Sequence, residues 1–289
     1  MDSAKREDRD QSRRFVVIGS QSSEEMLRAQ HLSEKLTWPL LSQEEPIPPD
    51  SLVLWVDEGP LRLQSLLPAE SRDTQPGPIW VDFLSPELER RRRQSLKSGQ
   101  LLARALGVTS KKRSSSLKIF DATAGMGQDA WIMAWMGPGV EVVAMERSFL
   151  LYQMLKDGLR RAEPKISEVK LEFVLGDSTQ YLLDLQNLAE PEAEAHPYDV
   201  IYLDPMFPPS TKAALSRKEM QVFQRLLAEQ DPLEMEAVAL LEAALKVANE
   251  RVVVKRPLKA KALRAGVSHS FKGQAVRYDM YLSGKKKLT

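Results

Sequence analysis

The sequence contains no cysteine, and its three histidines lie far apart, at His31, His196 and His269. The absence of cysteine excludes disulfides, thiolate-bound zinc and thiol nucleophiles, and it is compatible with a reducing compartment. Because the histidines are dispersed and no cysteine can join them, we expect no metal site in this protein.

The chain also lacks a long apolar run and a strong net charge. No segment reaches the roughly 18 consecutive apolar residues of a membrane helix, and no apolar stretch follows the charged first residues as it would in a secretory signal. We therefore expect a cytoplasmic protein without a membrane segment. The net charge is +1, so only local clusters of charge can indicate nucleic acid.

What is present is a globular composition, with 43% hydrophobic residues in a chain of 289. This length and composition allow one large or two modest domains. Residues 1–14 mix charges of both signs without apolar spacing, which predicts a disordered leader. Residues 15–85 combine short apolar runs with one amphipathic segment, which predicts a small N-terminal α/β domain whose last strand is Ile79–Phe83.

Residues 86–116 carry a concentration of basic side chains. They are predicted to form one helix, Pro86–Leu106, and a polar linker into the next domain. Arg91, Arg92 and Arg93 lie within an uninterrupted arginine run of this helix. Successive residues of a helix point in different directions, so the run is either a solvated surface or a surface that contacts phosphates.

Residues 117–289 are predicted to form the main domain, because apolar strand candidates alternate there with helical segments. Such alternation is typical of a parallel, doubly wound sheet. The last two strand candidates are close in sequence, with Gly273 between them, and predict a C-terminal hairpin. Five alternating strand candidates precede the hairpin, at residues 118–120, 140–145, 171–175, 200–203 and 251–255.

A glycine turn follows the first of these strands. Asp121 opens it, and Gly125, Gly127 and Ala130 match the dinucleotide pattern G-x-G-x-x-G/A. Glu146 ends the next strand, at the distance expected for an acid that binds ribose hydroxyls. The pattern does not separate NAD from S-adenosylmethionine, since both present an adenosine, and a turn that needs glycine only for its geometry stays an alternative.

A second motif at the end of the fourth strand favours methyl transfer over hydride transfer. Asp204 and the carbonyl of Pro205 could accept hydrogen bonds from an exocyclic amine, and Phe207 could stack on an extruded base. These three residues are the predicted catalytic group. The alternative is a proline-rich turn with Phe207 in the core.

Six motifs follow one another along the chain: DATAGMGQDAW, ERS, DGLRRA, YLDPMFPP, KEMQVFQ and VVVKRP. In this order they resemble the motifs of the RsmJ family of small-subunit ribosomal RNA methyltransferases. The resemblance covers roughly residues 79–282, and it includes WVDF ahead of the arginine run. Such a resemblance implies a Rossmann-like class I S-adenosylmethionine-dependent methyltransferase with a seven-stranded, mostly parallel sheet. It also implies methylation of guanine N2 in 16S ribosomal RNA, within the RNA or the small subunit.

The family pattern also implies which residues line the cofactor. This chain departs from the pattern at Gln128, where the family usually has arginine, at Gln94–Ser98, where it has a glycine-rich stretch, and at Pro209, where it has histidine. With the glycine turn, the predicted S-adenosylmethionine site consists of Asp121, Gly125, Gly127, Gln128, Asp129, Glu146, Arg147, Asp177, Ser178 and Asp204.

Basic residues near the strand ends are candidates for holding RNA phosphates, with a solvated surface as the alternative for each. Three other functions stay open: an NAD-linked oxidoreductase, a non-catalytic RNA-binding or ribosome-assembly protein, and methylation of DNA adenine or a protein amine. The candidate RNA-binding residues are Arg91, Arg92, Arg93, Lys212, Lys218, Lys255 and Arg256.

Overall fold

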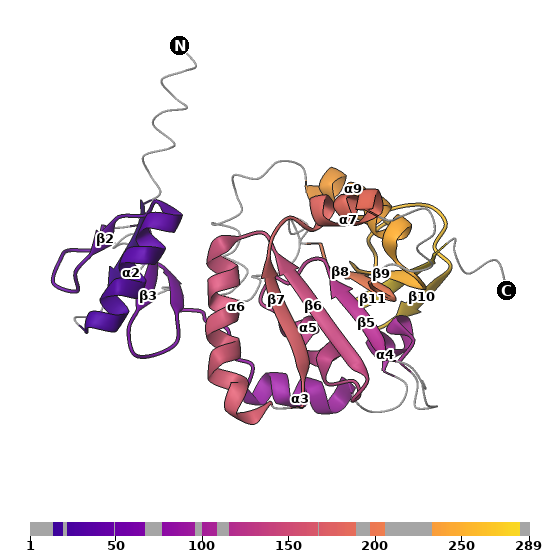
Figure 1. Cartoon of the computed structure of the whole chain (residues 1–289), viewed down its shortest axis with the longest axis horizontal. Helices are drawn as coiled ribbons and strands as arrows, with labels where there is room; N and C mark the ends of the chain where they lie inside the picture. Colours follow the sequence, from indigo (N-terminus) through magenta and orange to yellow (C-terminus); the bar gives the residue numbers. More distant parts are fainter. Residues whose placement is uncertain are drawn as a thin grey trace, which may run out of the picture. The chain divides into compact units, whose positions relative to one another are not determined.

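The computed structural model describes residues 14–19, 22–48, 50–66, 77–95, 100–108, 116–166, 168–188, 197–205 and 233–283. These residues divide into two compact units, the first ending at Val81 and the second beginning at Asp82, and each unit has its own sheet (Figure 1). The domain bounds set from the sequence at residues 14, 85 and 116 stay a prediction.

The first unit is a small α/β fold. Its sheet has the order β2-β1-β3-β4, in which β1 pairs in parallel with β2 and β3, and β4 is antiparallel to β3. Helix α2 buries Ala29 and Leu32, and Val16, Ile18 and Val53 form the core of the sheet. The elements are β1 (Arg14–Gly19), α2 (Ser23–Leu36), β2 (Leu40–Leu41), β3 (Ser51–Val56) and β4 (Arg62–Ser65).

The prediction of a strand at Ile79–Phe83 was wrong. Only Ile79 pairs with the sheet, through an isolated antiparallel bridge to Leu63. The chain then turns at Asp82, whose carboxylate accepts from the Leu84 N–H. Phe83, which already belongs to the second unit, stacks on Trp131 of helix α5 (Gln128–Ala134) in that unit. The apolar run alone predicts that pairing continues to Phe83, but Phe83 packs on Trp131 instead, and the pairing stops at Ile79.

The second unit is the predicted doubly wound fold. Its sheet has the order β10-β11-β9-β8-β5-β6-β7; β5 to β9 are mutually parallel, and β11 is antiparallel to β9. The C-terminal hairpin joins β10 to β11. The strands are β5 (Leu117–Asp121), β6 (Val140–Glu146), β7 (Lys170–Leu175), β8 (Val200–Leu203), β9 (Arg251–Pro257), β10 (His269–Lys272) and β11 (Val276–Leu282).

Alternation along the central strands separates two faces. Phe120, Ile201 and Val254 point into a core cluster that includes side chains of α7 and α9, and these two helices lie together over the sheet (Figure 1). Residues one position away point to the other face, since side chains alternate in a strand. The helices are α3 (Pro86–Ser95), α4 (Leu101–Leu106), α5 (Gln128–Ala134), α6 (Phe149–Ala162), η2 (Glu163–Lys165), α7 (Ser178–Leu188) and α9 (Leu233–Val247).

The single helix predicted for Pro86–Leu106 is two helices, α3 and α4. Gln100, at the start of α4, has an extended conformation with φ −60° and ψ 136°. The two helices also pack differently: α3 contacts α5, whereas α4 contacts β9, β10 and β11. Because the arginine run leaves α3 with few apolar residues, the spacing of apolar residues in this segment does not show where one helix ends and the next begins. Across the described residues, no helix is both long and apolar enough to cross a membrane.

Candidate active site

The site lies where the carboxyl ends of the parallel strands meet on one face of the sheet. Asp121 on β5 is paired in register with Tyr202 on β8, and Lys255 on β9 is paired with Tyr278 on β11. Alternation puts these side chains, and Asp204 just beyond β8, on the face opposite the core cluster of α7 and α9. Open α/β sheets bind their ligands at this edge.

The glycine turn between β5 and α5 has two glycines with different tasks. Both have positive φ, +54° at Gly125 and +71° at Gly127. A Cβ atom at Gly127 would lie 2.6 Å from Cδ2 of Leu155 and 2.9 Å from Cζ of Phe173, so packing requires glycine there. At Gly125 the nearest atom to such a Cβ is 4.0 Å away, so this glycine leaves space above the turn for a ligand.

Glu146 ends β6 directly beside this turn. Its Oε2 accepts a hydrogen bond from the Gly125 N–H at 2.9 Å, and its Oε1 accepts from the Ser148 N–H at 2.8 Å. The residue is 9% exposed. Burial raises the pKa of Glu146 above its ordinary value, although the N–H donors oppose the shift. A carboxylate with two fixed donors keeps further lone pairs that can accept from hydroxyl groups.

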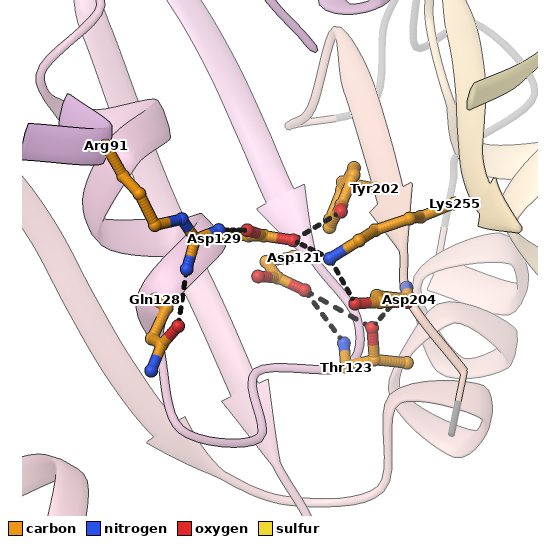
Figure 2. Close-up of polar contacts among 8 residues, drawn as sticks. All are labelled: Arg91, Asp121, Thr123, Gln128, Asp129, Tyr202, Asp204 and Lys255. Carbon is orange, nitrogen blue, oxygen red and sulfur yellow. Dashed lines mark hydrogen bonds and ion pairs between the residues drawn. The ribbon is translucent and has the colours of Figure 1, made fainter. Parts of the chain in front are cut away.

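A charged network occupies the strand ends, as Figure 2 shows. The Lys255 ammonium donates to Oδ2 of Asp129 at 2.7 Å and to Oδ2 of Asp204 at 2.8 Å. Asp129 also accepts from the Tyr202 hydroxyl at 2.7 Å and lies 3.2 Å from the guanidinium of Arg91. The network therefore joins residues from α3, α5, β8 and β9.

The charged groups of this network shift one another's pKa values. Burial raises the pKa of Asp129, but Lys255, Tyr202 and Arg91 together bring it below its ordinary value. Burial alone would lower the pKa of Lys255, yet Asp129 and Asp204 raise it well above the ordinary value. Burial and the Asp129 charge raise the pKa of Asp204, against the effects of Lys255 and Arg91. Asp129 and Lys255 are therefore a stable ion pair at neutral pH.

Asp121 is the buried member of the group, at 1% exposure. Its Oδ1 accepts from the Thr123 N–H at 3.0 Å, and the Thr123 hydroxyl oxygen accepts from the Asp204 N–H at 2.6 Å. Burial, reinforced by the carboxylates of Asp129 and Asp204, raises the pKa of Asp121 to about 8. At neutral pH this carboxyl is mainly protonated and acts as a support for the turn.

Other predicted cofactor residues have partners within the protein. Gln128 accepts from Arg91 at 2.5 Å through Oε1. Oδ1 of Asp177 accepts from the Gln180 N–H at 2.8 Å, and the Ser178 hydroxyl donates to the Ala122 carbonyl at 2.8 Å. Arg147 forms an exposed ion pair with Glu236 at 3.0 Å.

The described candidates for RNA binding do not form one surface in the structure. Arg91 and Lys255 belong to the charged network. Arg92 pairs with Glu89 at 2.6 Å and lies over the Trp135 ring. Arg256 is buried and donates to the Lys261 carbonyl. In this structure its guanidinium therefore faces the protein, and its contact with RNA stays a prediction.

Among the described members of the set, Arg93 has the most exposed side chain, at 75%. Phe207, Lys212 and Lys218 lie outside the described residues. Sequence reasoning missed Thr123 and Tyr202 as members of the site. The signal for Tyr202 was its spacing of two from Asp204 at the carboxyl end of one strand, which puts both side chains on one face.

Comparison with known proteins identifies the family. Residues 43–283 match a family model described as "Putative SAM-dependent methyltransferase". A protein of Marinobacter nauticus named ribosomal RNA small subunit methyltransferase J is 41% identical over 238 residues, which cover 80% of this chain and 77% of that protein. A protein of the same name from Thioalkalivibrio sulfidiphilus is 38% identical over 89% of this chain and 93% of its own length. The chain belongs to this methyltransferase family.

A solved structure agrees with this family at the level of fold. The SAM-dependent methyltransferase of Neisseria gonorrhoeae superposes with a TM-score of 0.62 over 93% of this chain and 96% of its own, at 24% identity. By its family the chain is a methyltransferase with S-adenosylmethionine as its cofactor, as the glycine turn and the Asp204 motif predicted together. Within the described ranges, no group of three or more His, Asp or Glu side chains is arranged to hold a metal ion.

Proposed function

We propose that this enzyme transfers a methyl group from S-adenosylmethionine to the exocyclic N2 of a guanine in small-subunit (16S) ribosomal RNA. The observation that carries the proposal is the position of Asp204. It lies at the cofactor edge of the sheet, its side chain is 39% exposed, and its Oδ2 is held by Lys255. Within the described part of the chain no donor reaches its Oδ1, which leaves an acceptor for a substrate N–H.

The glycine turn and the end of β6 are the proposed cofactor site. The space above Gly125 would hold the body of the cofactor, and Glu146 would accept from its ribose hydroxyls while still holding the turn. Asp177 and Ser178 lie at the start of α7, where backbone N–H groups and the Asp177 carboxylate would contact the adenine edge. S-adenosylmethionine supplies an electrophilic methyl group on a sulfonium, so positioning contributes much of the catalysis.

The proposed chemistry at Asp204 is acceptance of an N–H hydrogen bond, followed by acceptance of a proton. Bound there, S-adenosylmethionine would supply the methyl carbon: the amine nitrogen would form its bond to that carbon, and the carbon–sulfur pair would stay on sulfur. The nitrogen then carries a positive charge, and the pair of one N–H bond returns to nitrogen as the proton passes to Asp204. An anionic acceptor placed in advance stabilises that developing charge. The Pro205 carbonyl is proposed as the second acceptor, and Phe207 as a face for the base to stack on.

The RNA contacts are proposed on the exposed basic residues, with Arg93 first among the described ones. Phosphate contacts supply most of the affinity of such complexes. The proposed partner is 16S ribosomal RNA or the small subunit, and the proposed compartment is the cytoplasm, where that RNA is assembled and modified.

The test is transfer of tritium from labelled S-adenosylmethionine to free ribosomal RNA, to isolated small subunits and to whole ribosomes, with nucleoside analysis of the product. The proposal predicts labelled N2-methylguanosine from the small-subunit RNA in at least one of these forms. Label in another nucleoside, in ribosomal protein or in none of the three substrates would contradict it.

A further inference from the structure

Lys255 stands out because its surroundings do not fit a phosphate contact. Its ammonium lies between two carboxylates, 2.7 Å from Asp129 and 2.8 Å from Asp204, and its side chain is only 21% exposed. A phosphate at this position would be repelled by both anions. The neighbouring Arg256 points to the opposite face of β9, where it holds the Lys261 carbonyl. The two basic residues of the KRP motif therefore have separate tasks.

The network around Lys255 is fixed at one end and open at the other. Asp129 is held by the Tyr202 hydroxyl and by Arg91, in addition to Lys255. Its side chain is 11% exposed, whereas that of Asp204 is 39% exposed. Asp129 therefore anchors the ammonium, and the ammonium in turn holds Oδ2 of Asp204 (Figure 2).

We propose that Lys255 is a positioning residue for the methylation, acting through Asp204. Its ammonium keeps the Asp204 carboxylate ionised and fixes its Oδ2, so that Oδ1 accepts the N–H of the target amine. This inference rests on the proposed role of Asp204 as the amine acceptor. Nothing in it requires Lys255 to touch the substrate.

The electrostatics of the site support this role. Asp204 is partly desolvated, and Asp129 is an anion near it; both effects raise its pKa, while Lys255 and Arg91 lower it. The other titratable groups that face the network are Asp121, Tyr202 and Tyr278. A protonated Asp204 would present a donor on one oxygen and could no longer take up a proton. Loss of the Lys255 charge therefore shifts Asp204 toward its inactive form.

The first arm of the test is a double-mutant cycle between Lys255→Met and Asp204→Asn, read as single-turnover methylation with RNA and cofactor saturating. We expect Lys255→Met to slow the parent about 10²-fold, the typical effect of removing one preorganised electrostatic contact. In the Asp204→Asn background it should change the rate less than about threefold, because residues that act through one another are non-additive. Lys255→Arg should recover most of the parent rate, and Lys156→Met, an exposed lysine on α6, is the matched control.

The second arm is the pH–rate profile, which a purely structural role would not move. The proposed reaction requires ionised Asp204, whose pKa is lowered by Lys255 and raised by Asp129. The acidic limb of the profile should therefore move to higher pH in Lys255→Met and to lower pH in Asp129→Asn. An equal loss in both backgrounds, or an unmoved acidic limb, would overturn the inference. So would a reduced salt dependence of RNA binding in Lys255→Met, which would make Lys255 a phosphate ligand.

Thermal unfolding separates a loss of fold from a loss of rate. If Lys255→Met does not fold, Lys255→Gln, which is uncharged but keeps amide donors, takes its place with the same expected shift. The two hypotheses fail differently. A parent-like rate in Asp204→Asn contradicts the proposed amine acceptor, whereas a slow Asp204→Asn with a parent-like Lys255→Met contradicts only the role of Lys255.

Discussion

The backbone N–H of Gly125 donates a 2.9 Å hydrogen bond to Oε2 of Glu146. This bond joins the glycine turn after β5 to the acid that ends β6, two features that lie apart in the sequence. Because Oε1 of the same carboxylate accepts from the Ser148 N–H, Glu146 fixes the shape of the turn as well as offering acceptors to a ribose.

We expect Glu146→Ala to weaken S-adenosylmethionine binding by roughly 1.5–3 kcal/mol, the range for losing hydrogen bonds to a charged acceptor. Titration calorimetry measures this directly. Glu141→Ala, on the same strand but paired with the exposed Lys170, should bind the cofactor like the parent. If Glu146→Ala binds as tightly as the parent, the ribose assignment is wrong.

Two arginines of α3 should separate RNA binding from catalysis. Arg93 is exposed and shares Glu89 with Arg92, so Arg93→Ala should reduce the slope of log affinity against log salt by about 0.7–0.9 for a lost phosphate contact. Arg91 instead contacts Asp129 and Gln128, so Arg91→Ala should lower the turnover rate and leave the slope unchanged. Filter binding over a range of salt concentrations measures the slope, and an unchanged slope in Arg93→Ala would make Arg93 a solvated side chain without a phosphate contact.

Asp121 should make stability depend on pH. Between its ordinary pKa of 3.8 and its folded value of about 8, the folded chain holds a proton that the unfolded chain has lost. Unfolding releases this proton, so the free energy of unfolding should decrease as pH rises across this window, by at most about 1.4 kcal/mol per pH unit.

In Asp121→Asn that contribution disappears, while the amide oxygen still accepts from the Thr123 N–H. Urea unfolding at pH 6, 7 and 8 compares the two chains. The parent should lose more stability than Asp121→Asn over this interval; parallel pH dependences would mean that Asp121 is ionised in the folded protein.

The sequence predicted the large sheet well because its signals are local. The central strands contain apolar runs at residues 119–120, 142–145, 200–203 and 252–254, as expected for strands covered on both faces. The glycine turn directly follows the first of these strands. The position of Lys255 beside Asp129 and Asp204 could not be predicted from such local signals. It is 51 residues from Asp204 and 126 from Asp129 along the chain, and which face of β9 it occupies depends on the register of the whole sheet.

Tertiary packing also overrode local pattern at two places. The apolar run from Ile79 predicts a strand, but Phe83 packs on Trp131 and Phe173 instead. The helical spacing from Pro86 predicts one helix, but α4 buries Leu102, Ala105 and Leu106 independently of α3. Neither the end of the strand nor the division of the helix can be predicted from the local sequence, because each depends on packing against residues distant in the chain.

Asp204→Asn tests the account most directly, in single-turnover methylation with RNA and S-adenosylmethionine both saturating. The substitution keeps the shape of the side chain but replaces an anionic acceptor with a neutral amide that also carries donors. Cofactor and RNA affinities are measured separately, and RNA affinity should change little because phosphate contacts carry most of it. The account predicts a rate about 10²–10³ lower than that of the parent. A rate equal to that of the parent would contradict the assignment of Asp204 as the acceptor for the target amine.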